Sequence, residues 1–278
     1  MEKMIKREQI AGMNIHYLFY SLEYFLDAQA AAGIRTIEFW PGTPHFFLSY
    51  LEYSDCKRVR KLLNDRDLTL RVITPENCTY QYKFAAQEKE QFEKSLGYFR
   101  KALDAGGELG AEIMAINSGW GYWNEDREEA WKRSREMLSM LAEYAKERGI
   151  RLAMESLGPQ ESNLATTVQD VKRMLDEVNH PNLKAMIDTT AMGVAGETID
   201  QWFDILGEDI IHMHFIDGNP YGHLIWGDGT HDLKEFLSAL KRHNYTGYLG
   251  QEITEFDYFN DPAAADLRNM KAYEPYII

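Results

Sequence analysis

Short runs of strand-forming residues alternate with longer helical stretches along the whole chain, and this alternation limits the possible folds more than any other feature. Eight strand candidates can be counted, and several stretches between them carry apolar residues at three- and four-residue steps. The candidates are Ile10–Ile15, Thr36–Phe39, Leu68–Ile73, Glu112–Ile116, Arg151–Met154, Lys184–Ile187, Ile210–Phe215 and Tyr248–Gln251. Gly33, Gly110 and Gly149 stand just before a strand, where glycine commonly ends a helix.

Eight β/α units in 278 residues, roughly 31 to 35 residues per unit, match the size of a (β/α)8 TIM barrel. The sequence therefore predicts an α/β fold of this kind, with one domain over residues 1–278. A doubly wound open sheet is the alternative fold. It would place a glycine-rich phosphate turn after the first strand, and "MNIHYLFYSLEYF" lacks the G-x-G-x-x-G pattern.

Charge and cysteine content exclude several classes of partner and site. The 30 Lys and Arg residues against 44 Asp and Glu residues give a net charge of -14, which disfavours nucleic acid because its binding depends on neutralising phosphates. Cys56 and Cys78 lie far apart, so neither a disulfide framework nor a thiolate zinc site is indicated. The N-terminal segment is charged, and no run of about 18 apolar residues occurs. We expect a cytoplasmic protein without a membrane segment.

Residues of the type that binds metal ions stand at the ends of the fifth to eighth strand candidates. They are Glu155, Asp188, His214 and Glu252. Each alone could be a helix cap or a hydrogen-bonding residue, but parallel barrel strands all end at one mouth, where active sites are built. Three ionised carboxylates at that mouth would repel one another strongly without a cation. Oxygen ligands with one imidazole suit Mn²⁺, Co²⁺ or Mg²⁺ better than a structural zinc ion.

Two neighbours of this group have simpler interpretations. His212 shares a strand face with His214, one layer deeper, and is expected to pack inside the barrel. Asp217 is expected to cap the loop that follows the seventh strand.

Several segments resemble a known family, the xylose-isomerase-like TIM barrels of sugar isomerases and epimerases, which also contains a DNA-repair AP endonuclease. The segments are "IEFWPGTPH", "TPEN", "MESLGPQESN", "MIDTTA", "HMHFIDG", "GDG" and "GYLGQEI". They are most similar to the fructoselysine 3-epimerase branch, related to the D-tagatose and D-psicose 3-epimerases, and the resemblance covers essentially the whole chain. It implies one divalent ion, Mn²⁺ first and Co²⁺, Mg²⁺ or Zn²⁺ as alternatives, held by Glu155, Asp188, His214 and Glu252.

The resemblance also implies that Glu155 and Glu252 transfer protons. A ketose C3–H is too weakly acidic for a free carboxylate, but an ion bound to O2 and O3 stabilises the cis-enediolate that forms. Inversion at C3 needs a base on one face and an acid on the other, and the fifth and eighth strands lie well apart around the ring. The implied activity is inversion of C3 in a ketose or ketosamine.

Further residues are candidates for contact with the sugar. Glu161 matches a family position that hydrogen-bonds substrate hydroxyls, with a loop-capping role as the alternative. His223 lies where relatives place a polar or cationic residue over the substrate, with a solvated loop histidine as the alternative. Other candidates at the mouth are His16, Glu38, His45 and Glu76, and the aromatic residues Trp40, Phe46, Trp120, Tyr122, Trp123 and Trp226, which either wall the pocket or pack loops onto the barrel.

The pattern departs from the family at Ala191, where the tagatose-type epimerases and the endonuclease carry a histidine. Its loss, with the acidic composition, argues against an endonuclease with a multinuclear zinc site. Aldose–ketose isomerisation, a dehydratase or lyase step from the same enediolate, and a non-catalytic sugar-binding protein remain as alternatives. We expect a small-molecule sugar substrate and, because relatives are often dimers or tetramers, a homo-oligomer.

Overall fold

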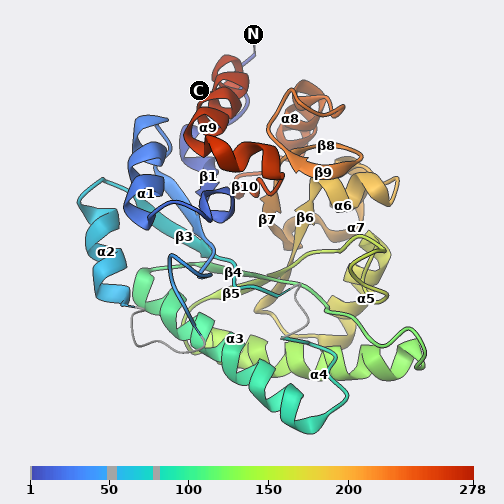
Figure 1. Ribbon diagram of the computed structural model, residues 1–278. Helices are drawn as coiled ribbons and strands as arrows, with labels where there is room; N and C mark the ends of the chain where they lie inside the picture. Colours follow the sequence, from blue (N-terminus) through green and yellow to red (C-terminus); the bar gives the residue numbers. More distant parts are fainter. Residues whose placement is uncertain (1, 49–54, 78–81) are drawn as a thin grey trace.

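A closed barrel of eight parallel strands forms the centre of the computed structural model, which describes residues 2–48, 55–77 and 82–278 (Figure 1). Cys78 lies outside these residues. The predicted (β/α)8 fold is confirmed, and the strands follow one another around the barrel in chain order. They are β1 (Ile10–Met13), β2 (Thr36–Phe39), β3 (Thr69–Ile73), β4 (Ile113–Ile116), β5 (Arg151–Met154), β6 (Leu183–Asp188), β7 (Ile210–His214) and β10 (Tyr248–Gln251).

Helices surround the barrel, and most begin at a side chain that caps them. They are α1 (Leu22–Ala31), α2 (Cys56–Asn64), α3 (Lys89–Leu109), α4 (Arg127–Lys146), α5 (Val168–Val178), α6 (Thr189–Val194), α7 (Ile199–Leu206), α8 (Leu233–Arg242) and α9 (Pro262–Tyr273). Ser21, Asp126 and Thr167, for example, accept hydrogen bonds from the first-turn N–H groups of α1, α4 and α5. Gly110 ends α3 at φ 89°, a left-handed conformation that favours glycine.

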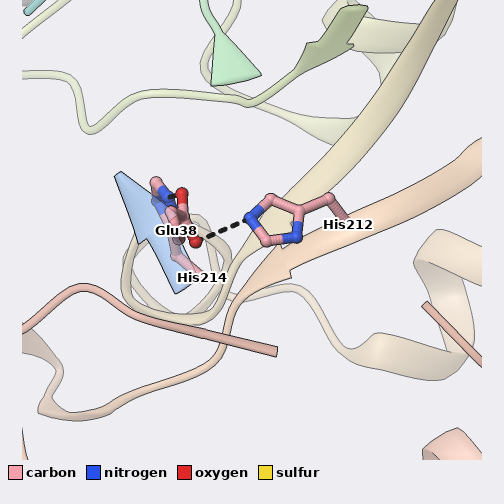
Figure 2. Close-up of side chains that lie close together, drawn as sticks. All are labelled: Glu38, His212 and His214. Carbon is pink, nitrogen blue, oxygen red and sulfur yellow. Dashed lines mark hydrogen bonds and ion pairs between the residues drawn. The ribbon is translucent and has the colours of Figure 1, made fainter. Parts of the chain in front are cut away.

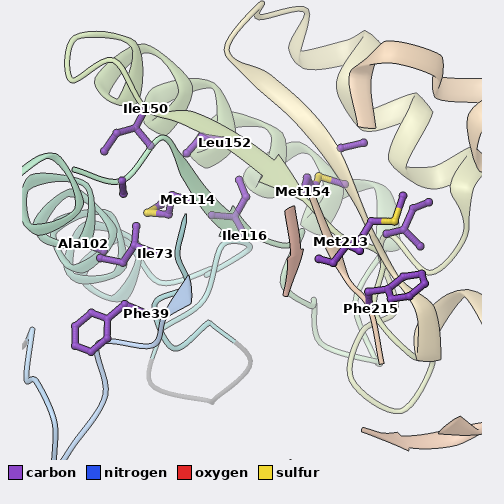
Figure 3. Close-up of a cluster of buried hydrophobic side chains, with 14 of the residues drawn as sticks. Phe39, Ile73, Ala102, Met114, Ile116, Ile150, Leu152, Met154, Met213 and Phe215 are labelled. Atoms are coloured by element: carbon purple, nitrogen blue, oxygen red, sulfur yellow. The ribbon is translucent and has the colours of Figure 1, made fainter. Parts of the chain in front are cut away.

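Alternation along the strands divides the core into two parts. Ile113 and Ala115 of β4 belong to the cluster inside the barrel. Met114 and Ile116 of the same strand belong to the larger cluster between strands and helices, part of which Figure 3 shows. Each fully buried aliphatic side chain of this kind contributes about 1.5–3 kcal/mol. These two layers hold the strand ends, and therefore the mouth of the barrel, in place.

Two features differ from the strand pattern expected from the sequence. The first strand ends at Met13 because residues Ile15–Tyr17 turn into a short 3-10 helix. A small antiparallel hairpin, β8 (Asp217–Asn219) and β9 (Tyr221–Leu224), follows β7 and was not expected. Figure 1 shows it beside α6, at the mouth of the barrel.

The two ends of the chain lie side by side, as Figure 1 shows, and Ile5 and Ile277 form a parallel bridge there. None of the helices in the described part of the chain is both long and apolar enough to span a membrane.

Candidate metal centre

The strand ends at the mouth bring together four predicted residues. The carboxylates of three of them surround a ring nitrogen of the fourth, His214. Asp188 and His214 end the paired strands β6 and β7, while Glu155 and Glu252 directly follow β5 and β10. The Nδ1 atom of His214 lies 3.0 Å from Glu252 Oε2, 3.3 Å from Glu155 Oε2 and 3.7 Å from Asp188 Oδ2. Parallel strands cause this convergence because their carboxyl ends all open at the same mouth.

The donor set around His214 fits a divalent cation. Its Nδ1 atom is buried and has no hydrogen-bond partner among the described residues, although three carboxylate oxygens surround it. Ligand atoms of Glu155, Asp188 and His214 all lie within 4.8 Å of one another, and so do those of Asp188, His223 and Glu252. A cation placed among them would offset the repulsion between the carboxylates and take up the free imidazole nitrogen.

Asp188 serves two purposes with its two oxygen atoms. Oδ1 accepts a hydrogen bond of 2.7 Å from the backbone N–H of Ala191 and so caps α6. Oδ2 faces His214, and also His223 Nε2 at 3.6 Å. The cap fixes the orientation of the side chain and keeps Oδ2 toward the cluster.

Glu155, Asp188 and Glu252 line a cavity of about 260 Å³, while the fully buried His214 is not among its lining residues. Glu161, Ala191 and His223 line the same cavity. The Nδ1 atom of His223 lies 3.2 Å from Glu252 Oε2. Glu161 also accepts a hydrogen bond of 3.0 Å from the N–H of Gly158, so it caps its loop and lines the cavity at once. The space suits one small polar molecule held by several charged groups.

Larger cavities lie elsewhere and carry less chemistry. One of about 620 Å³ opens at the strand starts, near Arg151 and Tyr248. Another of about 880 Å³ is lined by Trp40, Glu76 and Tyr98. Among the described residues, neither contains any of the residue groups that could hold a metal ion. The smaller cavity is the better candidate because convergent titratable groups mark an active site more reliably than volume does.

Electrostatics give the two glutamates of the cavity opposite properties. Burial raises the pKa of Glu155 to about 7. Burial alone would also raise the pKa of Glu252, but the imidazoles of His214 and His223 outweigh it and hold that pKa well below its usual range. Paired acids whose pKa values are driven apart are typical of sites that move protons.

The surrounding carboxylates favour the protonated form of the two imidazoles. Burial opposes their protonation, yet the pKa of His214 is raised well above its usual value by Glu252 and Glu38. The pKa of His223 is raised to about 9 by Asp188 and Glu252, again against the effect of burial. The cluster therefore attracts positive charge, whether from protons or from a metal ion.

Glu38 and His212 lie beneath the cavity and do not line it. Both are fully buried, as is His214. Figure 2 shows the three side chains together, with a dashed line from Glu38 to His212. The other oxygen of Glu38 lies 3.0 Å from His214 Nε2. The expectation that His212 packs inside the barrel is confirmed, whereas Glu38 has no exposed surface with which to meet a sugar.

Two other residues predicted at the mouth are buried and contact other buried residues. The buried Trp226 donates its indole N–H to the Phe215 carbonyl at 3.1 Å, and it packs in the core. Of the two roles expected for Trp226, its burial agrees with packing onto the barrel. His16 pairs with the buried Asp266 at 3.0 Å.

The remaining candidates also lie apart from the small cavity. His45 is buried and uses both ring nitrogens, toward Asn14 and the Tyr20 carbonyl. Glu76 lines the 880 Å³ cavity. The ring of Trp120 lies 3.7 Å from the Lys83 ammonium.

The hairpin β8–β9 supplies cavity residues that the strand pattern did not predict. Tyr221 and Gly222 line the cavity beside His223, and Thr190 hydrogen-bonds the Gly222 carbonyl at 3.1 Å. The segment "DGNPYGH" carries the Gly-Asn-Pro residues that favour a tight turn, which is the signal from which a hairpin could have been predicted. Asp217 caps this region as expected, since it accepts hydrogen bonds from Gly227 and Gly229.

Known proteins resemble the chain both in sequence and in fold. It is 31% identical to fructoselysine 3-epimerase from Escherichia coli O157:H7 over 240 residues, which is 86% of each chain. A D-psicose 3-epimerase with D-tagatose from Clostridium cellulolyticum H10 matches with a TM-score of 0.75 at 17% identity, covering 99% of this chain and 97% of that one. The IOLI protein with a binding zinc atom matches with a TM-score of 0.77 at 19% identity, covering 96% of each. The model of the xylose isomerase-like TIM barrel family matches residues 26–273, and the chain belongs to that family.

Proposed function

We propose that the protein is a divalent-metal-dependent sugar epimerase that inverts C3 of a ketose or ketosamine of the fructoselysine type. The observation that carries the proposal is the position of His214 Nδ1, with oxygens of Glu155, Asp188 and Glu252 at 3.0 to 3.7 Å. The resemblance to a fructoselysine 3-epimerase over most of both chains supports the substrate class. Mn²⁺ is the first candidate ion because three oxygen ligands and one imidazole suit it.

Glu155 and Glu252 are the proposed proton-transfer pair. They follow β5 and β10, which two other strands, β6 and β7, separate around the ring. A sugar carbon placed between them meets one carboxylate on each face, so one takes the C3 proton and the other delivers a proton to the opposite face. A divalent ion held by the four side chains would stabilise the negative charge that develops on the sugar oxygens.

The cavity walls would orient the sugar. Glu161 and His223 face the same cavity as the two glutamates, and their polar atoms suit hydroxyl groups. Polar groups at the walls hold the reacting carbon in register with the carboxylates, which is a large part of the rate enhancement in such reactions. We also propose a homo-oligomer, which sedimentation of the purified protein tests.

The decisive experiment is incubation of the Mn²⁺-loaded protein with a panel of fructosamines and ketoses in D₂O. The proposal predicts deuterium at C3, inverted configuration there, and a carbonyl that stays at C2. Movement of the carbonyl to C1 would show an isomerase instead, and loss of water a dehydratase. Binding without any exchange at carbon would show a non-catalytic sugar-binding protein.

A further inference from the structure

Glu38 lies on β2, on the far side of β1 and β10 from His214, yet its carboxylate contacts the His214 ring. We propose that Glu38 is a positioning residue that sets the tautomer and the orientation of His214, so that Nδ1 faces the three carboxylates. The proposal rests on the proposed function, since it assigns the residue that prepares one ligand of that metal centre.

Hydrogen bonds hold the Glu38 carboxylate from three sides. Oε1 lies 3.0 Å from His214 Nε2 and accepts a second hydrogen bond of 2.6 Å from the Thr74 hydroxyl. Oε2 lies 3.0 Å from His212 Nε2. All four side chains are buried, so water does not compete for these bonds. A carboxylate bound at both oxygens cannot rotate, and it presents fixed acceptors to both imidazoles.

The fixed acceptor decides which nitrogen of His214 carries the proton. An ionised carboxylate can only accept a hydrogen bond, so Nε2 must carry the N–H that points at Glu38. In a neutral ring this leaves the lone pair of Nδ1 directed at Glu155, Asp188 and Glu252. A carboxylate that hydrogen-bonds the other nitrogen of a metal-binding histidine also makes the imidazole a stronger electron-pair donor to the metal ion.

The neighbouring strand leaves room for this contact. Gly250 of β10 is paired with His214. A Cβ atom at Gly250 would lie 2.0 Å from Glu38 Oε2 and 3.2 Å from His212 Nε2, so any other residue would push into the hydrogen bonds. Gly250 thus leaves space for the Glu38 carboxylate, and Thr74 hydrogen-bonds it. Residues around a metal site commonly support a metal ligand in this way.

Glu38, His212 and His214 also have the spacing of a metal site, and this alternative makes a different prediction. The N···O distances of 3.0 Å are those of direct hydrogen bonds, which an ion between these atoms would have to replace. A positioning role predicts one bound ion per chain. A ligand role for Glu38 predicts a second ion.

The test is calorimetric titration of Mn²⁺ into the wild-type protein and the Glu38→Gln variant. Glutamine keeps the size of the side chain but removes its charge and one acceptor, and we expect binding of one ion that is about 10- to 100-fold weaker. Asp266→Asn is the matched control, because Asp266 is another buried carboxylate that bonds a buried histidine. Its affinity for Mn²⁺ should equal that of the wild type.

The outcomes separate this inference from the proposed function. Absence of Mn²⁺ binding to the wild type contradicts the proposed function. Equal affinity of the wild type and Glu38→Gln contradicts the positioning role alone, and so does a second ion that Glu38→Gln abolishes.

A measurement on the wild type covers the case in which Glu38→Gln does not fold. Long-range ¹H–¹⁵N correlation of the Zn²⁺-loaded protein reports which ring nitrogen of His214 is protonated. A proton on Nε2 and none on Nδ1 is expected, and the reverse tautomer overturns the proposal.

Discussion

Glu155 and Glu252 carry the same chemical group in different surroundings, and the proposal gives each one face of the sugar carbon. Replacement by glutamine keeps an oxygen that can bind a metal ion but removes the exchangeable proton. We expect Glu155→Gln and Glu252→Gln each to lower the epimerisation rate by about 10²–10⁴-fold, the usual contribution of a general acid or base.

The pair of variants should also differ from each other in a simple isotope experiment. Each keeps one carboxylate, so each should still exchange the C3 hydrogen of one epimer with D₂O without inverting it, and the two variants should act on opposite epimers. Glu197→Gln is the control, because Glu197 hydrogen-bonds Val168 and Trp202 away from the cavity. Exchange of the same epimer by both variants would contradict a two-carboxylate mechanism.

A substitution at Gly250 also tests the role of Glu38 in the metal centre. In Gly250→Ala the new methyl group would meet the Glu38 carboxylate, which three hydrogen bonds prevent from moving aside. We expect weaker Mn²⁺ binding, in the same direction as Glu38→Gln, and a lower melting temperature by calorimetry. Gly97→Ala is the matched control, since nothing lies within 4 Å of a Cβ there and the helix α3 should gain about 0.5–1 kcal/mol. Wild-type affinity in Gly250→Ala would contradict the argument.

Single residues also show what sequence could and could not predict. Glu155, Asp188, His214 and Glu252 could be selected because each stands at a strand end, and strand ends share a mouth. The role of Glu38 could not, because a strand end does not say whether a side chain points out of the mouth or across the interior. The same ambiguity left two roles open for Trp226, which packs in the core.

Among the elements, the loop after β7 is organised by one buried carboxylate. Asp217 accepts hydrogen bonds from Gly218 and His231 at Oδ1 and from Gly227 and Gly229 at Oδ2. It therefore ties the start of the hairpin β8–β9, which carries His223 into the cavity, to the segment before α8. A sequence pattern of eight strands does not contain this hairpin, because its strands are short and rich in glycine and polar residues.

Substitution of Asp217 should lower stability and weaken sugar binding, although Asp217 does not line the cavity. Asp217→Asn turns an acceptor into an N–H donor facing backbone N–H groups, so we expect a loss of about 1–3 kcal/mol in the free energy of unfolding. The Michaelis constant for the sugar should rise more than the turnover number falls, because the hairpin positions the cavity wall. Urea unfolding and steady-state kinetics measure the two effects. Asp232→Asn, which alters only the exposed cap of α8, is the control, and an equal effect on the Michaelis constant would contradict this role.

At the scale of the whole molecule, the barrel concentrates negative charge where its strands end. The chain has a net charge of -14, and four of its acidic residues, Glu155, Asp188, Glu161 and Glu252, line one small cavity. Packing of the two core layers holds these groups together despite their repulsion. The alternation of strands and helices was sufficient to predict the barrel, because few folds accommodate eight such units. The sequence could not predict the protonation of the cavity residues, because their pKa values depend on distances of a few ångströms between charged atoms.

This balance predicts that a divalent ion stabilises the fold. An ion that binds the folded chain and not the unfolded one adds about 2.7 kcal/mol at 100 times its dissociation constant, and so raises the melting temperature by roughly 5 °C. The double variant Glu155→Gln, Asp188→Asn keeps the cap of α6 but removes two negative charges. Its rise in melting temperature with Mn²⁺ should be less than half as large as that of the wild type. Differential scanning calorimetry with Mn²⁺ and with EDTA makes the comparison, and an equal rise in both proteins would place the bound ion away from these carboxylates.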